Sequence, residues 1–274
     1  MTEPVQQVKR LADSHALAAR CADLGIDLPI DHDVAAGGVM AAPLVVRDGS
    51  AGDRSIGNRW TVLPMEGWDA TTDGEPTDLV RRRWRRFGES GAKLIWGGEA
   101  VAVDPDGRAN PLQLIISSDT AAGLASLREE LVAAHALGHG RTDDLVVGLQ
   151  LTHSGRWSRP HGELAPRVVQ HHPVLESRAG AGDPVLLTDD DLDALVTKFV
   201  DAAKLAADAG FDFVDVKHCH GYLLHELLAA RTRPGRFGGP LSHRLGVLTA
   251  VTEAVRASRP ELAVGVRLSA YDFL

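Results

Sequence analysis

A dense group of chemically active side chains follows a short apolar run at 211–216. Lys217, His218, Cys219, His220 and Tyr222 lie within six residues, and leucines then resume at helical spacing. Amines, imidazoles and phenols can hold a substrate oxygen or move a proton. In a (β/α) barrel, the carboxyl end of a strand is the catalytic face. The segment therefore predicts a catalytic strand end.

The elements that would position this segment alternate between strands and helices. Strands are predicted over 60–65, 93–96, 145–151, 211–217 and 263–268, and helices over 5–24, 77–88, 188–208, 120–137 and 242–258. Such alternation is typical of a parallel sheet covered by helices. Thr188 and Asp191 have the spacing of a capping box. The segment 153–187 is too long for a simple connection and predicts a substrate-covering excursion.

Alternate positions within three of these strands carry polar side chains. Gln150, Lys217 and Arg267 lie on the parity opposite to the valines and leucines of their strands. Because the apolar parity of a barrel packs against the helices, we expect these three side chains to converge inside the barrel. Since an unliganded buried charge is costly, they indicate an anion or a planar ligand with carbonyl and ring-nitrogen acceptors. The alternative is an internal ion pair between Asp215 and Lys217.

A series of short motifs occurs in order along these strands. They are Asn58, Arg59 and 63–65, Glu99 and Ala100 with Gly107 and Arg108, then Gln150, Leu151, His153, Gly155 and Arg156, then 220–222, Arg233 with 237–239, and 267–269. Over residues 56–274 the chain thereby resembles the Old Yellow Enzyme family of FMN-dependent NADH:flavin oxidoreductases and ene-reductases. The resemblance implies an α/β fold, the TIM (β/α)8 barrel.

The resemblance also implies a reaction and its residues. FMN would take hydride from NAD(P)H and pass it to an activated alkene of the enone type. Lys217 and His220 would hold the substrate carbonyl, and Tyr222 would protonate the α-carbon. The cofactor would be lined by Pro64, Met65, Glu66, Ala100, Gln150 and Arg267.

Two residues depart from the family pattern. The family usually has His at the position of Lys217 and Thr or Cys at the position of Glu66. A carboxylate beside the flavin would disfavour its anionic reduced form. A lysine offers a compact charge with three donors, so it favours ligands with an anionic or strongly polarised oxygen. These departures bear on the substrate range more than on the fold.

A complete barrel has eight strands and ~250 residues as a rule, whereas only five core strands can be placed here. We therefore expect a barrel truncated after the fifth strand and belonging to a longer oxidoreductase, which alone would bind FMN weakly and aggregate through its strand edges. A barrel completed by another chain is the alternative. Residues 1–55 are expected to be an N-terminal extension and barrel-bottom lid, and 56–274 a partial FMN-binding barrel.

Composition limits the other possibilities. The 274 residues carry a net charge of -8, which disfavours nucleic acid and anionic membranes as partners, and no long apolar run opens the chain. We expect a cytoplasmic enzyme that acts on small molecules, and a homo-oligomer is compatible with this composition. The two cysteines form no metal signature, and no metal is expected. Alternatives are a metal-dependent barrel hydrolase using His218 and His220, and a non-catalytic partial barrel.

Overall fold

The structure is a computed structural model that describes residues 7–33, 37–47, 51–180 and 183–270. The chain divides into two compact units, Met1–Ala42 and Pro43–Leu274. In the first unit, a short 3-10 helix η1 (Val8–Arg10) precedes helix α1 (Ser14–Asp23). The prediction of one helix over 5–24 was wrong over the described residues, because Asp13 is extended and its carboxylate caps α1 by accepting from the Ala16 amide at 2.8 Å.

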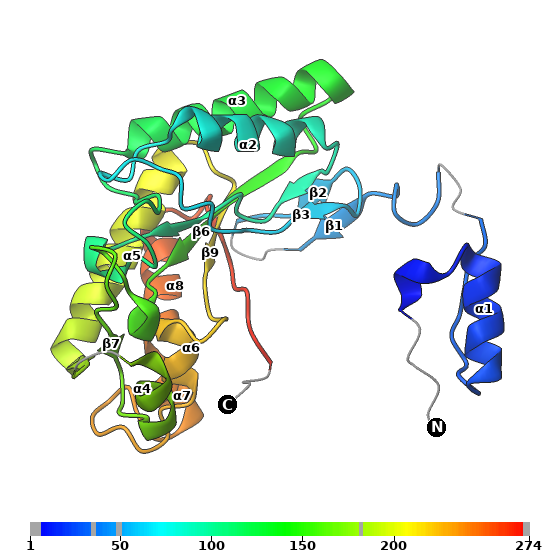
Figure 1. The fold of residues 1–274 in the computed structure, drawn as a ribbon. Helices are drawn as coiled ribbons and strands as arrows, with labels where there is room; N and C mark the ends of the chain where they lie inside the picture. Colours follow the sequence, from blue (N-terminus) through cyan, green and yellow to red (C-terminus); the bar gives the residue numbers. More distant parts are fainter. Residues whose placement is uncertain (1–6, 34–36, 48–50, 181–182, 271–274) are drawn as a thin grey trace. The chain divides into compact units, whose positions relative to one another are not determined.

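The second unit is built on a parallel sheet with the order β10-β9-β6-β4-β3, and β5 also pairs with β6 (Figure 1). The bounds are β3 (Thr61–Val62), β4 (Leu94–Ile95), β5 (Ala100–Ala102), β6 (Val146–Thr152), β9 (Phe213–Val216) and β10 (Ala263–Gly265). All five predicted strands are present, and the sheet is part of an α/β barrel. The sequence did not predict β5. This strand pairs with β6, as β4 does, after a break at 96–99.

The helices that cover the sheet are α2 (Asp78–Glu89), α3 (Ala121–His139), α5 (Asp189–Asp208) and α8 (Gly246–Ser258). Helices α2 and α3 lie side by side, as do α5 and α8 (Figure 1). The predicted capping box of α5 is confirmed, since the Thr188 hydroxyl accepts from the Asp191 amide and the Asp191 carboxylate accepts from the Thr188 amide. The predicted helix over 242–258 is divided into α7 (Leu241–Arg244) and α8.

Strand parity sorts the side chains as predicted for β6 and β9. Val147, Leu149 and Leu151 are fully buried in the core shared with the helices. On the opposite face, a Cβ on Gly148 would lie 2.2 Å from the Phe213 ring, so only glycine fits there. The last strand departs from the pattern: β10 ends at Gly265, and Leu268 is 61% exposed rather than packed outward.

The base of the barrel interior is apolar. Ile56, Val146 and Phe213 are buried together, with Leu94, Trp96 and Ala263 packed against them. Ile56 ends the hairpin of β1 (Leu44–Val46) and β2 (Arg54–Ile56). Arg54 of this hairpin contacts Asp212 at 3.3 Å and donates to the Glu261 carbonyl at 2.7 Å. The hairpin thus lies at the amino ends of β9 and β10, while the assignment of all of 1–55 as a lid stays a prediction.

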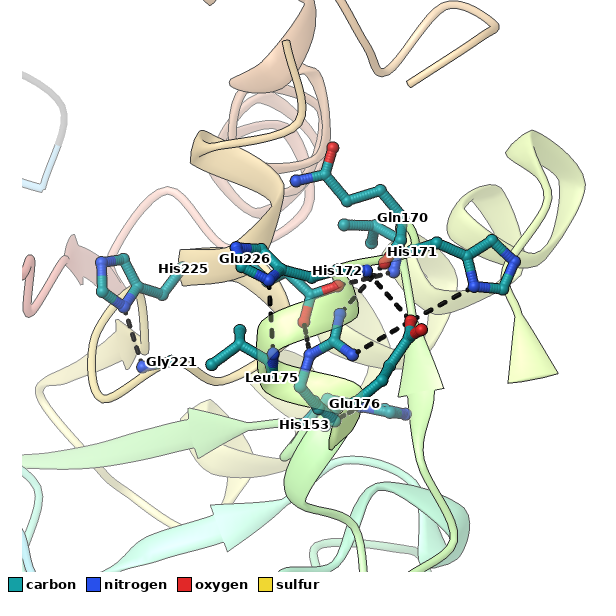
Figure 2. A network of polar contacts seen from close by, with 12 residues as sticks. His153, Gln170, His171, His172, Leu175, Glu176, Gly221, His225 and Glu226 are labelled. Carbon is teal, nitrogen blue, oxygen red and sulfur yellow. Dashed lines mark hydrogen bonds and ion pairs between the residues drawn. The ribbon is translucent and has the colours of Figure 1, made fainter. Parts of the chain in front are cut away.

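The excursion over 153–187 is ordered by its own elements. It contains η3 (Gly155–Trp157), β7 (Arg167–Val168), α4 (Pro173–Ala179) and β8 (Val185–Leu186). Arg156, almost fully buried, donates to Glu226 of α6 (Leu223–Leu228) at 2.9 Å and to the Gln170 carbonyl at 3.0 Å. Figure 2 shows this network tying the excursion to α6. Its role as a substrate cover stays a prediction.

Candidate functional site

The candidate site lies where the parallel strands end. Pro64, Met65 and Glu66 follow β3, Gln150 lies within β6, and Lys217–Tyr222 follow β9. Arg267 lies two residues beyond β10, and an isolated bridge between His218 and Leu268 continues the β9–β10 pairing to this level. Since carboxyl ends of parallel strands meet at one edge, segments as distant as 64–66 and 267 contribute to one site.

Gln150 and Arg267 are joined by Asp215. The Gln150 amide nitrogen donates to Asp215 Oδ2 at 2.5 Å, and the Arg267 backbone N–H donates to Asp215 Oδ1 at 2.6 Å. Burial raises the pKa of Asp215, against the lowering effect of both donors. The alternative prediction, an ion pair between Asp215 and Lys217, was wrong, because Lys217 pairs with Glu66. Asp215 was not predicted as a site residue, although its inward parity pointed to this position.

Close packing accompanies this junction. Gly97, at φ +158°, lies so near β6 that an added Cβ would be 2.9 Å from both Cβ and the backbone nitrogen of Gln150. A side chain there would displace Gln150 from its position beside Asp215. Gly97 lies between β4 and β5, so the strand pairing is interrupted at the point where the backbone packs against Gln150.

Lys217, Glu66 and Tyr222 form one cluster. Lys217 Nζ lies 2.7 Å from Glu66 Oε1, and the Tyr222 hydroxyl donates to Glu66 Oε2 at 2.7 Å. Lys217 Nζ also lies 3.8 Å from the centroid of the Tyr222 ring, a cation–π distance. Burial, and then the Glu66 carboxylate, raise the pKa of Tyr222 far above its usual range. The two residues that depart from the family pattern are therefore partners of each other.

The loop that carries Glu66 is held by a second carboxylate. Glu99 is buried and accepts from the Gly67 amide at 3.3 Å and from Arg83 Nε at 3.1 Å. Burial raises the pKa of Glu99, against the lowering effect of Arg83. Trp68, with φ +51°, donates its indole N–H to Glu66 Oε2 at 3.1 Å. Sequence patterns gave no signal for the roles of Arg83 and Trp68, which depend on this loop geometry.

The histidines between Lys217 and Tyr222 have different environments. His220 is exposed, with φ +64°, and its amide donates to Ser269 Oγ at 3.4 Å. Partial burial, then Lys217 and Arg267, lower the pKa of His220. His218 is buried with Nδ1 2.8 Å from the Val216 carbonyl. Across the described ranges, no three His, Cys, Asp or Glu side chains gather as metal ligands. Burial also raises the pKa of Cys219, as befits a packed thiol.

The site offers donors and apolar surface suited to a flat heteroaromatic ring. In the described part of the chain, the Arg267 guanidinium makes one hydrogen bond, from Nη1 to the Pro64 carbonyl at 3.3 Å. Met65 is 54% exposed and Leu268 is 61% exposed. Pro64 and Ala100 are buried. These residues fit FMN, since a ring with edge acceptors would cover the apolar side chains and use the remaining guanidinium donors.

Residues 50–274 match the model of the NADH:flavin oxidoreductase / NADH oxidase family. The chain is 30% identical over 231 residues to an NADPH dehydrogenase of Bacillus velezensis, covering 81% of this chain and 62% of the relative. It is 33% identical over 233 residues to an NADPH dehydrogenase of Geobacillus thermodenitrificans, covering 80% and 61%. The chain thus belongs to this flavin oxidoreductase family, as the resemblance to Old Yellow Enzymes predicted, and it spans about three fifths of the length of these relatives.

Solved structures of flavin oxidoreductases have a similar fold. A morphinone reductase in complex with tetrahydroNAD matches with a TM-score of 0.67 and 26% identity, over 86% of this chain and 65% of that one. An Old Yellow Enzyme from Pichia sp. matches with a TM-score of 0.64 and 22% identity, over 83% and 59%, and supports the fold. The predicted barrel class is thereby confirmed for the part that the chain contains. None of the described helices is long and apolar enough to span a bilayer.

Proposed function

We propose that this chain contributes the flavin and substrate face of an FMN-dependent oxidoreductase that moves hydride from NAD(P)H to an activated alkene of the enone type. The observation that carries this proposal is the junction of Gln150, Asp215 and Arg267 beside the cluster of Lys217 and Tyr222, at strand ends in a chain of this family. The named relatives are NADPH dehydrogenases, which supports NAD(P)H as the donor.

The cofactor would be held mainly by two side chains. Gln150, fixed by Asp215, presents an amide to the pyrimidine edge of the ring, and Arg267 presents a guanidinium. Pro64, Met65 and Ala100 line the ring. Bound FMN supplies the hydride acceptor and donor. A fixed guanidinium beside a ring that gains electrons provides preorganised stabilisation of negative charge.

Substrate handling would fall to the segment after β9. Lys217 and His220 orient the substrate carbonyl, and Tyr222 exchanges a proton with the α-carbon. Glu66 was predicted as a flavin-lining residue, and its carboxylate is engaged by Lys217 and Tyr222. We therefore propose that Glu66 acts on the substrate-handling residues Lys217 and Tyr222.

The wider setting follows from the same proposal. The partners are small molecules, namely NAD(P)H and an alkene, and neither nucleic acid nor a membrane is required. A cytoplasmic location and a homo-oligomer are consistent with the proposal, as is a role of 1–55 as extension and lid around the partial barrel formed by 56–274.

The test is an FMN titration by quenching of flavin fluorescence, with Arg267→Ala beside a control, Arg259→Ala. Arg259 is a partly exposed residue before β10 that pairs with Asp208. Loss of one charged hydrogen bond costs about 1.5–3 kcal/mol, so Arg267→Ala should weaken FMN binding about tenfold or more, and the control should not. Bound flavin in the unsubstituted protein should also be bleached by NADPH and recoloured by cyclohexenone. Equal affinity in both variants would contradict the assignment, and no flavin binding at all would favour a non-catalytic partial barrel.

A further inference from the structure

The hydrogen bond between Tyr222 and Glu66 has a direction. The phenol O–H donates to the carboxylate at 2.7 Å, and Trp68 donates to the same carboxylate oxygen. The proton of Tyr222 therefore points at Glu66, and the phenol oxygen keeps its acceptor capacity. The buried Ser154 hydroxyl is a hydrogen-bonding neighbour that lowers the pKa of Tyr222, and the second lone pair of the phenol oxygen remains for a ligand. Tyr222 as a whole residue is partly exposed.

With Glu66 ionised, this arrangement suits removal of a proton, and the same groups acting in reverse, from protonated Glu66 through Tyr222, would deliver one. If Tyr222 gave its proton to a substrate while Glu66 stayed ionised, a phenolate would form beside a carboxylate in a mostly buried place. Burial and the Glu66 charge oppose that phenolate, which is why the pKa of Tyr222 is raised. A proton entering the phenol oxygen while the phenol proton passes to Glu66 leaves Tyr222 neutral throughout.

We propose that Tyr222 and Glu66 form a base relay that removes a proton from the carbon next to a substrate carbonyl. The Cα–H bond breaks and a new O–H bond forms on Tyr222, while the original Tyr222 O–H bond breaks and a new O–H bond forms on Glu66 Oε2. The electron pair of the C–H bond forms the Cα=C double bond of an enolate, while the C=O π bond breaks and its electron pair moves onto the carbonyl oxygen. The proposal rests on the proposed function for its carbonyl substrate, and no oxidant enters this step.

Lys217 completes the charge balance. Before the transfer, its ammonium is paired with the Glu66 carboxylate at 2.7 Å, and its side chain is 3% exposed. When Glu66 is protonated, the ammonium loses its counter-charge as the enolate oxygen gains one. The net charge of the buried site is unchanged, which avoids the cost of an unpaired buried charge. Lys217 is thus arranged to stabilise the enolate only once the proton has moved.

Other titratable groups surround this relay. Cys219 raises the pKa of Tyr222 slightly, after the effects of burial and Glu66. The charges of Lys217 and Arg267 both lower the pKa of His220. Burial keeps Cys219 a thiol and His220 neutral near pH 7, since the pKa of the first is raised and that of the second is lowered. As a protonated thiol, Cys219 does not compete with Glu66 as the proton acceptor. Removal of this proton is the acid–base step of an α,β-desaturation of a ketone, for which FMN, when bound, would supply the hydride acceptor.

The test is exchange of the α-hydrogens of cyclohexanone in deuterated buffer, followed by proton NMR with added FMN and without NADPH. The unsubstituted protein should accelerate exchange, and Glu66→Gln and Tyr222→Phe should each lose about 10²-fold or more, the usual size of a general-base effect. Glu66→Asp should recover part of the rate. In Glu66→Gln the residual rate should rise with hydroxide, because Tyr222 must then ionise alone, whereas the unsubstituted rate should be flat around neutral pH.

A control variant separates the relay from general destabilisation. Glu89→Gln removes an exposed carboxylate that pairs with Arg86, and it should exchange at the unsubstituted rate. Circular dichroism checks that all variants are folded. Full exchange by Glu66→Gln, or none by the unsubstituted protein, would overturn the relay. If the protein binds FMN and reduces cyclohexenone but exchanges no α-hydrogen, the relay fails and the proposed function stands, whereas failure to bind FMN counts against the proposed function.

Discussion

Two clusters in this chain are centred on a glutamate, Glu226 in one and Glu66 in the other. Their hydrogen bonds have similar lengths, but the two clusters have different roles. In the first, Glu226 accepts from Arg156 Nε at 2.9 Å and from the Val169 amide at 3.1 Å. In the second, Glu66 accepts from Lys217 and from the Tyr222 hydroxyl, both at 2.7 Å. The first lies between the excursion and α6, and the second lies at the ends of β3 and β9.

The difference is in the donors. Arginine and a backbone amide cannot give up their protons at ordinary pH, so the Glu226 cluster can only hold segments together. Tyr222 carries one transferable proton and Lys217 can change partners, so the Glu66 cluster can pass a proton and still keep its net charge. A buried carboxylate thus indicates scaffold or chemistry according to what donates to it.

The largest expected effect is on stability, at the first cluster. Glu226→Ala would remove the acceptor of Arg156 Nε and of the Val169 amide, and the guanidinium, 1% exposed, would keep only the Gln170 carbonyl and Glu176 at 3.5 Å among its described partners. Breaking such a buried pair costs about 3–5 kcal/mol, which urea unfolding would measure. Glu261→Ala, at an exposed carboxylate 3.9 Å from Arg259, should change the free energy of unfolding by less than about 0.5 kcal/mol. A loss below about 1 kcal/mol for Glu226→Ala would mean that the cluster does not hold the excursion.

A pH effect of comparable size is expected beside this cluster. Burial lowers the pKa of His153 to about 4, and its Nδ1 accepts from the Gly155 amide at 3.1 Å. The folded state thus binds this proton less readily than the unfolded state. The stabilisation is full above about pH 6.5 and is lost as pH falls toward 4, by about 3 kcal/mol in total. His153→Asn keeps an acceptor and cannot titrate, so its unfolding free energy, measured at both ends of this range, should fall less. An equal fall would refute the assignment.

The smallest expected effect is on ligand affinity, at the cluster of Glu66, Lys217 and Tyr222. Lys217 was predicted to favour anionic oxygens, but its ammonium is already paired with Glu66. Glu66→Gln should free one charged donor and tighten 4-nitrophenolate binding about tenfold in equilibrium dialysis. Adding Lys217→Met to that variant should remove the gain. Unchanged binding in Glu66→Gln would show that the pair does not restrain Lys217.

Much of the framework could be predicted from the sequence. The parallel strands, the inward parity of Gln150 and Lys217, and the capping of α5 by Thr188 all follow from local patterns. These features depend on periodicity over a few residues, which the sequence carries directly. The order of motifs along the strands was sufficient to identify the family.

The pairings across the site could not be predicted in this way. Glu66 and Lys217 are 151 residues apart in sequence, and Asp215 could equally have paired with Lys217 by proximity alone. Which carboxylate meets which cation depends on where the loop after β3 turns, and Glu99 and Arg83 hold that loop through contacts with no sequence period. The two-residue strands β7 and β8 were likewise too short to produce a pattern.

The claim that Glu66 controls Tyr222 can be measured most directly by titrating the phenol itself. The chain has two tyrosines, Tyr222 and Tyr271, so in a Tyr271→Phe background the near-ultraviolet phenolate absorbance reports on Tyr222 alone. With Glu66 present, we expect no phenolate at about pH 11, one unit above the ordinary phenol value, while the protein remains folded. With Glu66→Gln added, the phenolate should form at least about one pH unit lower. Identical titrations with and without Glu66 would contradict the account.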